Sequence, residues 1–272
     1  MPELPEVETI VRGLRHPLLG RRVLRARLRY AALYRKGSLK VTWLVGRKIT
    51  AVERVGKNAV LRFGRSGLMT VNLGMTGRLV LAGAGATDRP PRHKHRHGRF
   101  IFDRGTELDF YDPRRFGYVY ITENRDLRGE LNIGPDPFEM SSRGTELGEA
   151  LRGRRAPIKS MLLDQRIVSG IGNIYADETL FAARMDPRTP AGAVASRSRE
   201  LLAAARTVLG RAIDHGGSTV RDYRRSDGSR GEFQQHHAVY GREGDPCLLC
   251  GTAIERIVLA SRSAHFCPLC QA

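Results

Sequence analysis

The four cysteines constrain the fold of this chain more than any other feature, because all of them lie between residues 247 and 272. They form two pairs, with the spacing Cys247-x2-Cys250-x16-Cys267-x2-Cys270. Two tight turns that each present two thiolates suit one tetrahedral Zn²⁺, and four thiolates leave no ligand position for a substrate. We therefore predict one structural zinc ion. Two disulfides are the alternative, but a basic chain without a secretory signal belongs in a reducing compartment.

The charge of the chain is strongly positive. Lys and Arg number 46 against 28 Asp and Glu, which leaves a formal charge of +18. A compact fold with this excess repels itself unless a polyanion shares its surface, so nucleic acid is the expected partner. A GC-rich genome, which raises the arginine content, is the alternative explanation. No apolar run is long enough to cross a bilayer and the acidic start does not resemble a secretory signal, so we expect a cytoplasmic protein without a membrane partner.

The pattern of apolar residues changes along the chain. After a helix over about 5–18, short alternating segments such as VLRARLRY and NAVLRFG predict an antiparallel β-sandwich or barrel. From about residue 135 the apolar period becomes helical, and the segment IGPDPFEM at 133–140 has the composition of a linker. We predict an α+β multidomain protein. Its domains are an N-terminal sandwich over 1–134, a helical domain over 135–235 and a cysteine module over 236–272.

The first residues, MPELPEVET, hold two prolines and three glutamates. The first turn of a helix explains them in part, because proline and acidic side chains both favour that position. A catalytic interpretation is also open. Removal of Met1 would expose Pro2 as a secondary amine beside the carboxylate of Glu3. An α-amino group titrates near pH ~8, so a fraction of it is nucleophilic at neutral pH.

Two loop motifs place apolar side chains beside arginines. GMTGR contains Met75, and DPRRFG contains Arg114 and Phe116. Loop side chains of this kind usually pack on their own domain. On a basic protein they are also candidates for wedges that part base pairs while a guanidinium fills the gap.

Basic and glycine-rich segments supply further candidates. Asn173 follows two glycines at a predicted helix start, which is either a tight turn or a phosphate site with Lys159 upstream. The segment RHKHRHGRF places His93, His95 and His97 at alternate positions, which suits a DNA-facing basic ribbon, a solvated strand or, less well, a metal site.

Two more segments allow either a purely structural or a functional interpretation. Lys57 is either a surface lysine or a group that lowers the pKa of a nearby amine, holds a phosphate or moves protons. The polar segment 215–233 is too rich in glycine to form a core. Its amides, with Ser218 and Thr219, are candidates for reading a base edge.

Taken in order, these motifs resemble the bacterial formamidopyrimidine-DNA glycosylase family, which excises oxidised purines such as 8-oxoguanine from DNA. The resemblance covers essentially the whole chain. It is based on MPELPEVET, GK at 56–57, LGMTG, KHRH, DPRRFG, GIGNIYADE, GGST, VYGR and the cysteine module. It implies a β-sandwich, a helix–two-turn–helix domain with a lesion-recognition loop that holds Ser218 and Thr219, and a zinc finger.

The resemblance also implies residue roles. Pro2 would attack C1′ of the damaged nucleoside, and Glu3 would donate the proton that assists departure of the base. Lys57 would serve β-elimination and Arg262 would serve δ-elimination. The positions that match contacts to the DNA backbone are His95, Arg114, Arg154, Lys159 and Asn173. The positions that match gap-filling residues are Met75, Arg114 and Phe116.

This chain departs from the family pattern at Asn72, where a histidine is common, and at Asn58, where an aromatic residue is common. We expect these changes to affect substrate preference more than activity. The expected partner is damaged double-stranded DNA, bound by a monomer. Two other functions stay open: an endonuclease VIII-like enzyme for oxidised pyrimidines, and a non-catalytic zinc-ribbon protein that binds nucleic acid through charge alone.

Overall fold

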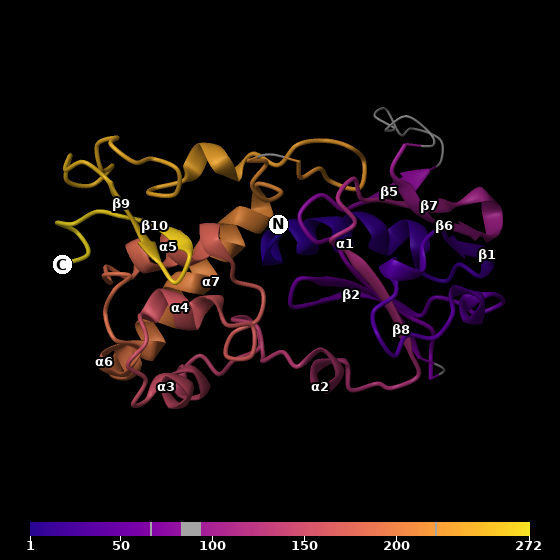
Figure 1. Ribbon diagram of the computed structural model, residues 1–272, viewed down its shortest axis with the longest axis horizontal. Coiled ribbons are helices and arrows are strands. Elements are labelled where there is room, and N and C mark those ends of the chain that lie inside the picture. The colour runs from indigo at the N-terminus through magenta and orange to yellow at the C-terminus, as the bar shows by residue number, and fades with distance from the viewer. Residues whose placement is uncertain (66, 83–93, 221) are drawn as a thin grey trace. The chain divides into compact units, whose positions relative to one another are not determined.

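The computed structural model describes residues 1–65, 67–82, 94–220 and 222–272 (Figure 1). Contacts between residues divide the chain into two compact units. The first consists of Met1–Glu130 with His215–Glu232, and the second of Leu131–Asp214 with Phe233–Ala272. The glycine-rich segment therefore belongs by its contacts to the first unit, although the sequence predicted it as part of the helical domain. The three domain boundaries drawn from the sequence stay a prediction.

Helix α1 (Leu4–Leu18) opens the first unit. Its apolar side chains recur at helical spacing and are buried, so one face of α1 belongs to the core of the sandwich. Pro5 lies in the first turn, where its missing N–H costs no hydrogen bond. Glu3 and Glu6 form a capping box at the helix start. The acidic start is thus a helix N-terminus, as one of the two interpretations predicted.

Two four-stranded antiparallel sheets follow α1 in the first unit, so the predicted sandwich is confirmed. One sheet has the order β1-β6-β7-β5, and the other the order β2-β3-β4-β8. The strands are β1 (Val23–Leu28), β2 (Ala51–Val55), β3 (Asn58–Arg62), β4 (Leu68–Asn72), β5 (Arg78–Ala82), β6 (Arg96–Phe102), β7 (Glu107–Tyr111) and β8 (Tyr118–Thr122). Short helices connect them: η1 (Ala31–Leu33), η2 (Val41–Leu44) and η3 (Asp103–Gly105). One core cluster contains Phe100 and Phe110 from one sheet and Val71 and Val119 from the other.

The second unit is helical, as predicted, and it ends in a β-hairpin. Its helices include α3 (Thr145–Leu151), α4 (Ile158–Leu163), α5 (Asn173–Ala182), α6 (Ala191–Val194), η4 (Ala195–Arg197), α7 (Ser198–Asp214) and η5 (Phe233–His236), and α2 (Leu127–Leu131) lies at the boundary of the units. Strands β9 (Glu255–Leu259) and β10 (Arg262–Phe266) pair antiparallel. Helix α5 packs against α7 and against β10, which Figure 1 shows in yellow. Among the described helices, none is long and apolar enough to cross a membrane.

Candidate functional site

The N-terminal turn places Pro2 and Glu3 in a buried position just before α1. The N–H of Glu3 donates to Oε2 of Glu6 at 2.8 Å. The second oxygen of the same carboxylate, Oε1, accepts the N–H of Ser218 at 2.7 Å. Glu6 is 2% exposed. One buried carboxylate therefore joins the N-terminal turn to the glycine-rich segment.

The segment 215–232 closes on itself, because the N–H of Glu232 donates to the carbonyl of His215 at 3.0 Å. The hydroxyl of Tyr223 lies 3.1 Å from the carbonyl of Gly216 and 3.3 Å from the carbonyl of Glu6. Burial, with the nearby charge of Glu6, raises the pKa of Tyr223. Gly217 has φ +80, and a Cβ there would lie 2.8 Å from Oε1 of Glu6, so only glycine fits.

The two residues expected to read a base edge contribute to this internal network. The N–H of Ser218 is bound to Glu6. The hydroxyl of Thr219 accepts the N–H of Gly231 at 2.8 Å and lies 3.3 Å from the carbonyl of Tyr223. The groups of Ser218 and Thr219 named here fix the shape of the segment.

Lys57 lies in the two-residue turn between β2 and β3 and is 9% exposed, so it is not a surface lysine. Arg54 supports this turn from within the same unit. Its Nη1 donates to the carbonyl of Gly56 at 3.0 Å, and its Nε donates to Glu8 on α1 at 3.1 Å. The hairpin that holds Lys57 is thus tied to the helix that follows Pro2 and Glu3.

The loops of Met75 and Phe116 form one structure. The buried carboxylate of Asp112 accepts the hydroxyl of Thr76 at 2.5 Å and the N–H of Gly117 at 2.7 Å. Gly74 has φ +56, and a Cβ there would meet the Phe116 backbone at 2.5 Å. Met75 is 40% exposed and Phe116 is 55% exposed, so both side chains project from their domain.

Arg114 belongs to the same pair of loops. Its guanidinium carbon lies 4.5 Å from the centre of the Phe116 ring, in a cation–π contact. Its backbone N–H donates to the hydroxyl of Thr76 at 3.2 Å. The arrangement leaves an apolar tip and a cation side by side on a rigid base.

The histidine segment does not form the alternating face that the sequence allowed. His95 has φ +64 and precedes β6, and the register of β6 on β7 shifts between Arg96 and Gly98. His97 is buried, with Nε2 at 2.9 Å from the carbonyl of Asp112, and burial lowers its pKa. His95 is half-buried, and His93 lies outside the described residues.

The second unit holds Arg154, Lys159 and Asn173 in different environments. Arg154 is exposed on the turn after α3. Asn173 begins α5, and its Nδ2 donates to the hydroxyl of Ser263 at 3.2 Å. Lys159 is 1% exposed; its Nζ lies 2.6 Å from Oδ1 of Asp177 and also donates to the carbonyl of Ser263. The expected phosphate contact is therefore not available to the Lys159 ammonium in this structure, because burial and these partners enclose it.

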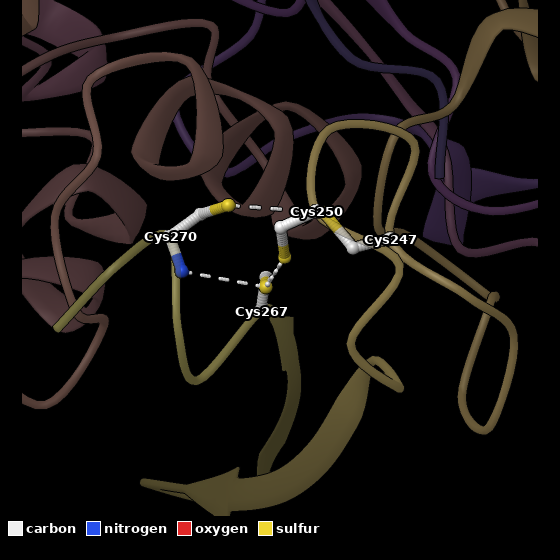
Figure 2. A group of neighbouring side chains, drawn as sticks. All are labelled: Cys247, Cys250, Cys267 and Cys270. Carbon is white, nitrogen blue, oxygen red and sulfur yellow. Dashed lines mark hydrogen bonds between the residues drawn. The ribbon is translucent and has the colours of Figure 1, made fainter.

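The four cysteines come together at one point of the second unit (Figure 2). Their sulfur atoms all lie within 4.8 Å of one another, with Cys247 and Cys270 at 3.9 Å and Cys250 and Cys267 at 3.5 Å. Zn–S bonds of about 2.3 Å in a tetrahedron separate the sulfurs by about 3.8 Å, so the site fits zinc. All four cysteines are free thiols, not disulfides.

Thiol chemistry points to the same conclusion. Hydrogen bonds from Thr252 lower the pKa of Cys250 to about 6, whereas the adjacent Cys250 sulfur and burial raise the pKa of Cys270 to about 12. Crowding thus opposes four thiolates at this spacing unless a cation is bound among them. The N–H groups of Leu249 and Cys270 donate to Cys247 and Cys267, each at 3.4 Å, as in tight turns that present thiolates. This is one structural zinc site.

Comparison with known proteins agrees with this geometry. Three family models match in order: the formamidopyrimidine-DNA glycosylase N-terminal domain over residues 1–119, the formamidopyrimidine-DNA glycosylase H2TH domain over 133–224, and a zinc finger found in FPG and IleRS over 244–272. The chain belongs to the formamidopyrimidine-DNA glycosylase family. It is therefore an enzyme of the DNA glycosylase class.

Relatives in this family match the chain over its full length. Formamidopyrimidine-DNA glycosylases of Solibacter usitatus and Rhizorhabdus wittichii are 43% and 44% identical, over 100% of this chain and 99% and 100% of theirs. The crystal structure of the Thermus thermophilus protein MutM (FPG) is 40% identical, with a TM-score of 0.86 over 99% of this chain and 98% of that one. A Lactococcus lactis Fpg in complex with abasic-site DNA is 32% identical, with a TM-score of 0.86 over 99% of each chain.

The two departures from the family pattern are partners of each other. Asn58 and Asn72 lie opposite on β3 and β4, and Nδ2 of Asn72 donates to Oδ1 of Asn58 at 3.0 Å. Tyr118 donates to the same oxygen at 3.3 Å, and Oδ1 of Asn72 accepts the N–H of Gly74 at 3.0 Å. The pair thus connects the strand after Lys57 to the loop that holds Met75.

Three buried carboxylates that organise these segments were not among the site residues predicted from the sequence. Glu6 and Asp112 fix the loops of the first unit, and Asp177 binds Lys159 and His265 in the second. Each lies inside a sequence motif whose predicted role concerns another residue. Their partners are distant in sequence, and only the capping-box spacing of Glu3 and Glu6 was available as a signal.

Proposed function

We propose that this enzyme is a bifunctional base-excision repair protein that removes oxidised purines, such as 8-oxoguanine and formamidopyrimidines, from duplex DNA and then cleaves the abasic strand. The observation that carries the proposal is the buried Pro2–Glu3 turn, which Glu6 fixes at the start of α1. A protein that only binds nucleic acid has no need of a processed secondary amine beside a carboxyl group. Membership of the glycosylase family supports the same choice.

Removal of Met1 makes Pro2 the nucleophile. Its nitrogen bonds to C1′ as the glycosidic bond breaks, and Glu3 donates a proton to the departing base. Glu3 then takes up the proton that the Pro2 nitrogen loses and donates it to the ring oxygen of the sugar, so that the ring opens. The product is an iminium between Pro2 and the ring-opened sugar. Because the iminium withdraws electrons, the C2′ proton becomes acidic and the 3′ phosphate leaves by β-elimination. One covalent intermediate thus explains both activities.

Lys57 and Arg262 complete the strand cleavage. Lys57 stands in a hairpin that Arg54 ties to α1, and we assign it to the β-elimination step. Arg262 is exposed at the start of β10, and we assign it to the phosphate contact that assists δ-elimination. The zinc ion holds the finger that carries Arg262 and takes no part in the chemistry.

The loops of Met75, Arg114 and Phe116 suit base eversion. A base inside a duplex must be flipped out before C1′ can be attacked, at a cost of a few kcal/mol in lost stacking. Exposed apolar tips can enter the gap, and the guanidinium beside them can face the orphaned base. Contacts to the DNA backbone are assigned to His95, Arg114, Arg154 and Asn173. Ser218 and Thr219 stay assigned to the lesion-recognition loop, whose shape they fix.

The charge of the chain and its thiol-based zinc site support two further assignments. A formal charge of +18 favours the DNA polyanion as the partner, with affinity that falls steeply as salt rises. Free thiols at a zinc site suit a reducing compartment such as the cytoplasm. We propose that the enzyme acts there as a monomer.

The test is excision from a duplex that holds one 8-oxoguanine opposite cytosine, compared with one that holds thymine glycol. We expect wild type to cleave the first duplex faster, and Pro2→Gly and Glu3→Gln to lose at least two orders of magnitude in rate. Glu53→Gln, in a half-exposed ion pair with Arg62, is the matched carboxylate control. Faster cleavage at thymine glycol would favour an endonuclease VIII-like enzyme. Binding without cleavage of either duplex would overturn the proposal.

A further inference from the structure

Strand β10 pairs with β9 along one edge, and side chains bind the backbone groups of its other edge. In the β9–β10 hairpin, Arg262 pairs with Leu259 across a two-residue turn, so the next residues alternate in direction. Ser263 and His265 therefore point their backbone groups away from β9. The carbonyl of Ser263 accepts from Lys159, and the N–H of His265 donates to Oδ2 of Asp177 at 3.0 Å. The ion pair of Lys159 and Asp177 thus binds the backbone groups that a third strand would bind.

Side chains reinforce the same edge. Asn173 and Asp177 are four residues apart on α5 and share one face of it. Asn173 binds the hydroxyl of Ser263 at 3.2 Å, and Asp177 lies 3.1 Å from Nδ1 of His265. We call Lys159, Asn173 and Asp177 the β10 clamp. Lys159 and Asp177 are both fully buried and lie 2.6 Å apart, so the clamp is part of the core of the second unit.

The turn that the clamp borders is strained. Its two central residues, Ala260 and Ser261, have φ +46 and φ +64. A two-residue turn of this type favours Asn-Gly, because side chains such as those of alanine and serine are unfavourable at positive φ. Such strain persists only where the surrounding structure holds the backbone in place. Arg262 follows directly, and no described residue forms a hydrogen bond or ion pair with its side chain. The position of its guanidinium therefore depends on the backbone.

We propose that the β10 clamp is a positioning device for Arg262. Lys159 is then a positioning residue that acts through the Ser263 carbonyl and does not touch DNA. The inference rests on the proposed function in one respect, the role of Arg262 in δ-elimination. It replaces the phosphate contact that the sequence predicted for Lys159. A buried ion pair is also better suited to specifying a geometry than to adding stability, since its desolvation offsets much of its attraction.

The decisive variant is Lys159→Met combined with Asp177→Asn. It removes both charges and the bond to the Ser263 carbonyl, and it keeps an amide oxygen for the N–H of His265. The milder Ser263→Ala removes only the contact with Asn173 and should fold in any case. Arg166→Met, which removes an exposed ion pair with Asp164 in the same unit, is the matched control. Zinc content is measured for each protein.

Two readouts are needed. On an abasic-site duplex, we expect the ratio of δ- to β-elimination products to fall about tenfold in the double variant and two- to threefold in Ser263→Ala, with borohydride trapping within twofold of wild type. Arg262→Gln should lower the ratio equally, and adding it to the double variant should lower it no further. In the free protein, amide exchange across residues 259–265 should accelerate at least tenfold in the double variant with zinc retained.

A rescue experiment separates positioning from general stability. Replacing Ala260 and Ser261 with Asn and Gly relieves the turn, so it should restore most of the product ratio in the double variant. The inference would be overturned if the product ratio were unchanged in both the double variant and Ser263→Ala while Arg262→Gln lowered it. The proposed function would stand in that case. A wild type that neither traps nor cleaves would overturn the proposed function. If the wild type is inactive, amide exchange across residues 259–265 still tests the clamp. Exchange that is unchanged in the double variant would then show that the clamp does not position the hairpin.

Discussion

Glu6 in the first unit and Asp177 in the second do the same structural task with different partners. Both are buried carboxylates that hold a segment far away in the sequence. Glu6 accepts two neutral backbone N–H groups, from Glu3 and Ser218. Asp177 binds the ammonium of Lys159 at 2.6 Å and the N–H and ring of His265.

The difference has a physical consequence. A carboxylate that binds neutral amides can be neutralised at the cost of the hydrogen bonds alone. A carboxylate that binds a buried ammonium cannot, because its loss leaves an uncompensated charge in the core. We infer that the buried ion pair of Asp177 and Lys159 fixes the hairpin of the second unit firmly.

Removal of zinc should have the largest effect, and it tests whether the β10 clamp can hold the hairpin unaided. Structural zinc contributes on the order of 10 kcal/mol of folding free energy at small finger sites. We expect Cys267→Ser to lose zinc and the exchange protection of β9 and β10, while the first unit keeps its own. Leu248→Ala, at an exposed position between two ligands, is the control. Full protection of the hairpin without zinc would show that the clamp is sufficient.

Neutralising each carboxylate compares the two directly. Asp177→Asn should lower the free energy of unfolding of its unit by about 3–5 kcal/mol, because Lys159 stays buried without a counter-charge. Glu6→Gln should cost about 1–3 kcal/mol, because the amide replaces one of two accepting oxygens. Urea unfolding followed by amide exchange in each unit measures both values. Equal losses, or a larger loss for Glu6→Gln, would remove the distinction between the two carboxylates.

Acid should weaken the second unit through His237. Burial lowers the pKa of His237 to about 4, from 6.5 in an unfolded chain. The unfolded state therefore binds a proton first as pH falls. Stability is complete above pH 6.5 and is lost between pH 6.5 and 4, by up to about 3 kcal/mol.

The first unit should respond in the same direction through His97, whose pKa burial also lowers. His237→Gln should flatten the pH dependence of the second unit, and His236→Gln, at an exposed neighbouring position, should change it much less, because burial is the larger cause of the His237 shift. Chemical denaturation at pH 7 and pH 4.5 measures the difference. A second unit as stable at pH 4.5 as at pH 7 would contradict the lowered pKa of His237.

The smallest expected effect concerns Asn58 and Asn72. Their hydrogen bond joins two neutral amides, and the donors to Glu6 are neutral amides as well. A double-mutant cycle of Asn58→Ala and Asn72→Ala should give a coupling of about 1 kcal/mol in stability. Cleavage at 8-oxoguanine should change less than tenfold in each variant. A coupling near zero would show that the two departures from the family pattern are independent.

Much of the fold could be predicted from the sequence, because the signals are local. Cysteine spacing alone placed the zinc site, and alternation of apolar residues predicted the sandwich strands. The burial of Lys159 could not be predicted, since its partners Asp177 and Ser263 come from another helix and from the hairpin. The link from Glu6 to Ser218 spans 212 residues. For the same reason the contacts of the glycine-rich segment with the first unit could not be predicted.

The catalytic residues stay a prediction drawn from motif positions, and one measurement tests them most directly. Wild-type enzyme is incubated with a duplex carrying 8-oxoguanine opposite cytosine, reduced with borohydride, digested and mapped by mass spectrometry. We expect a single sugar adduct on the peptide that begins at Pro2, attached at its amine. An adduct on Lys57 or another lysine, or no adduct with Met1 retained, would contradict this expectation.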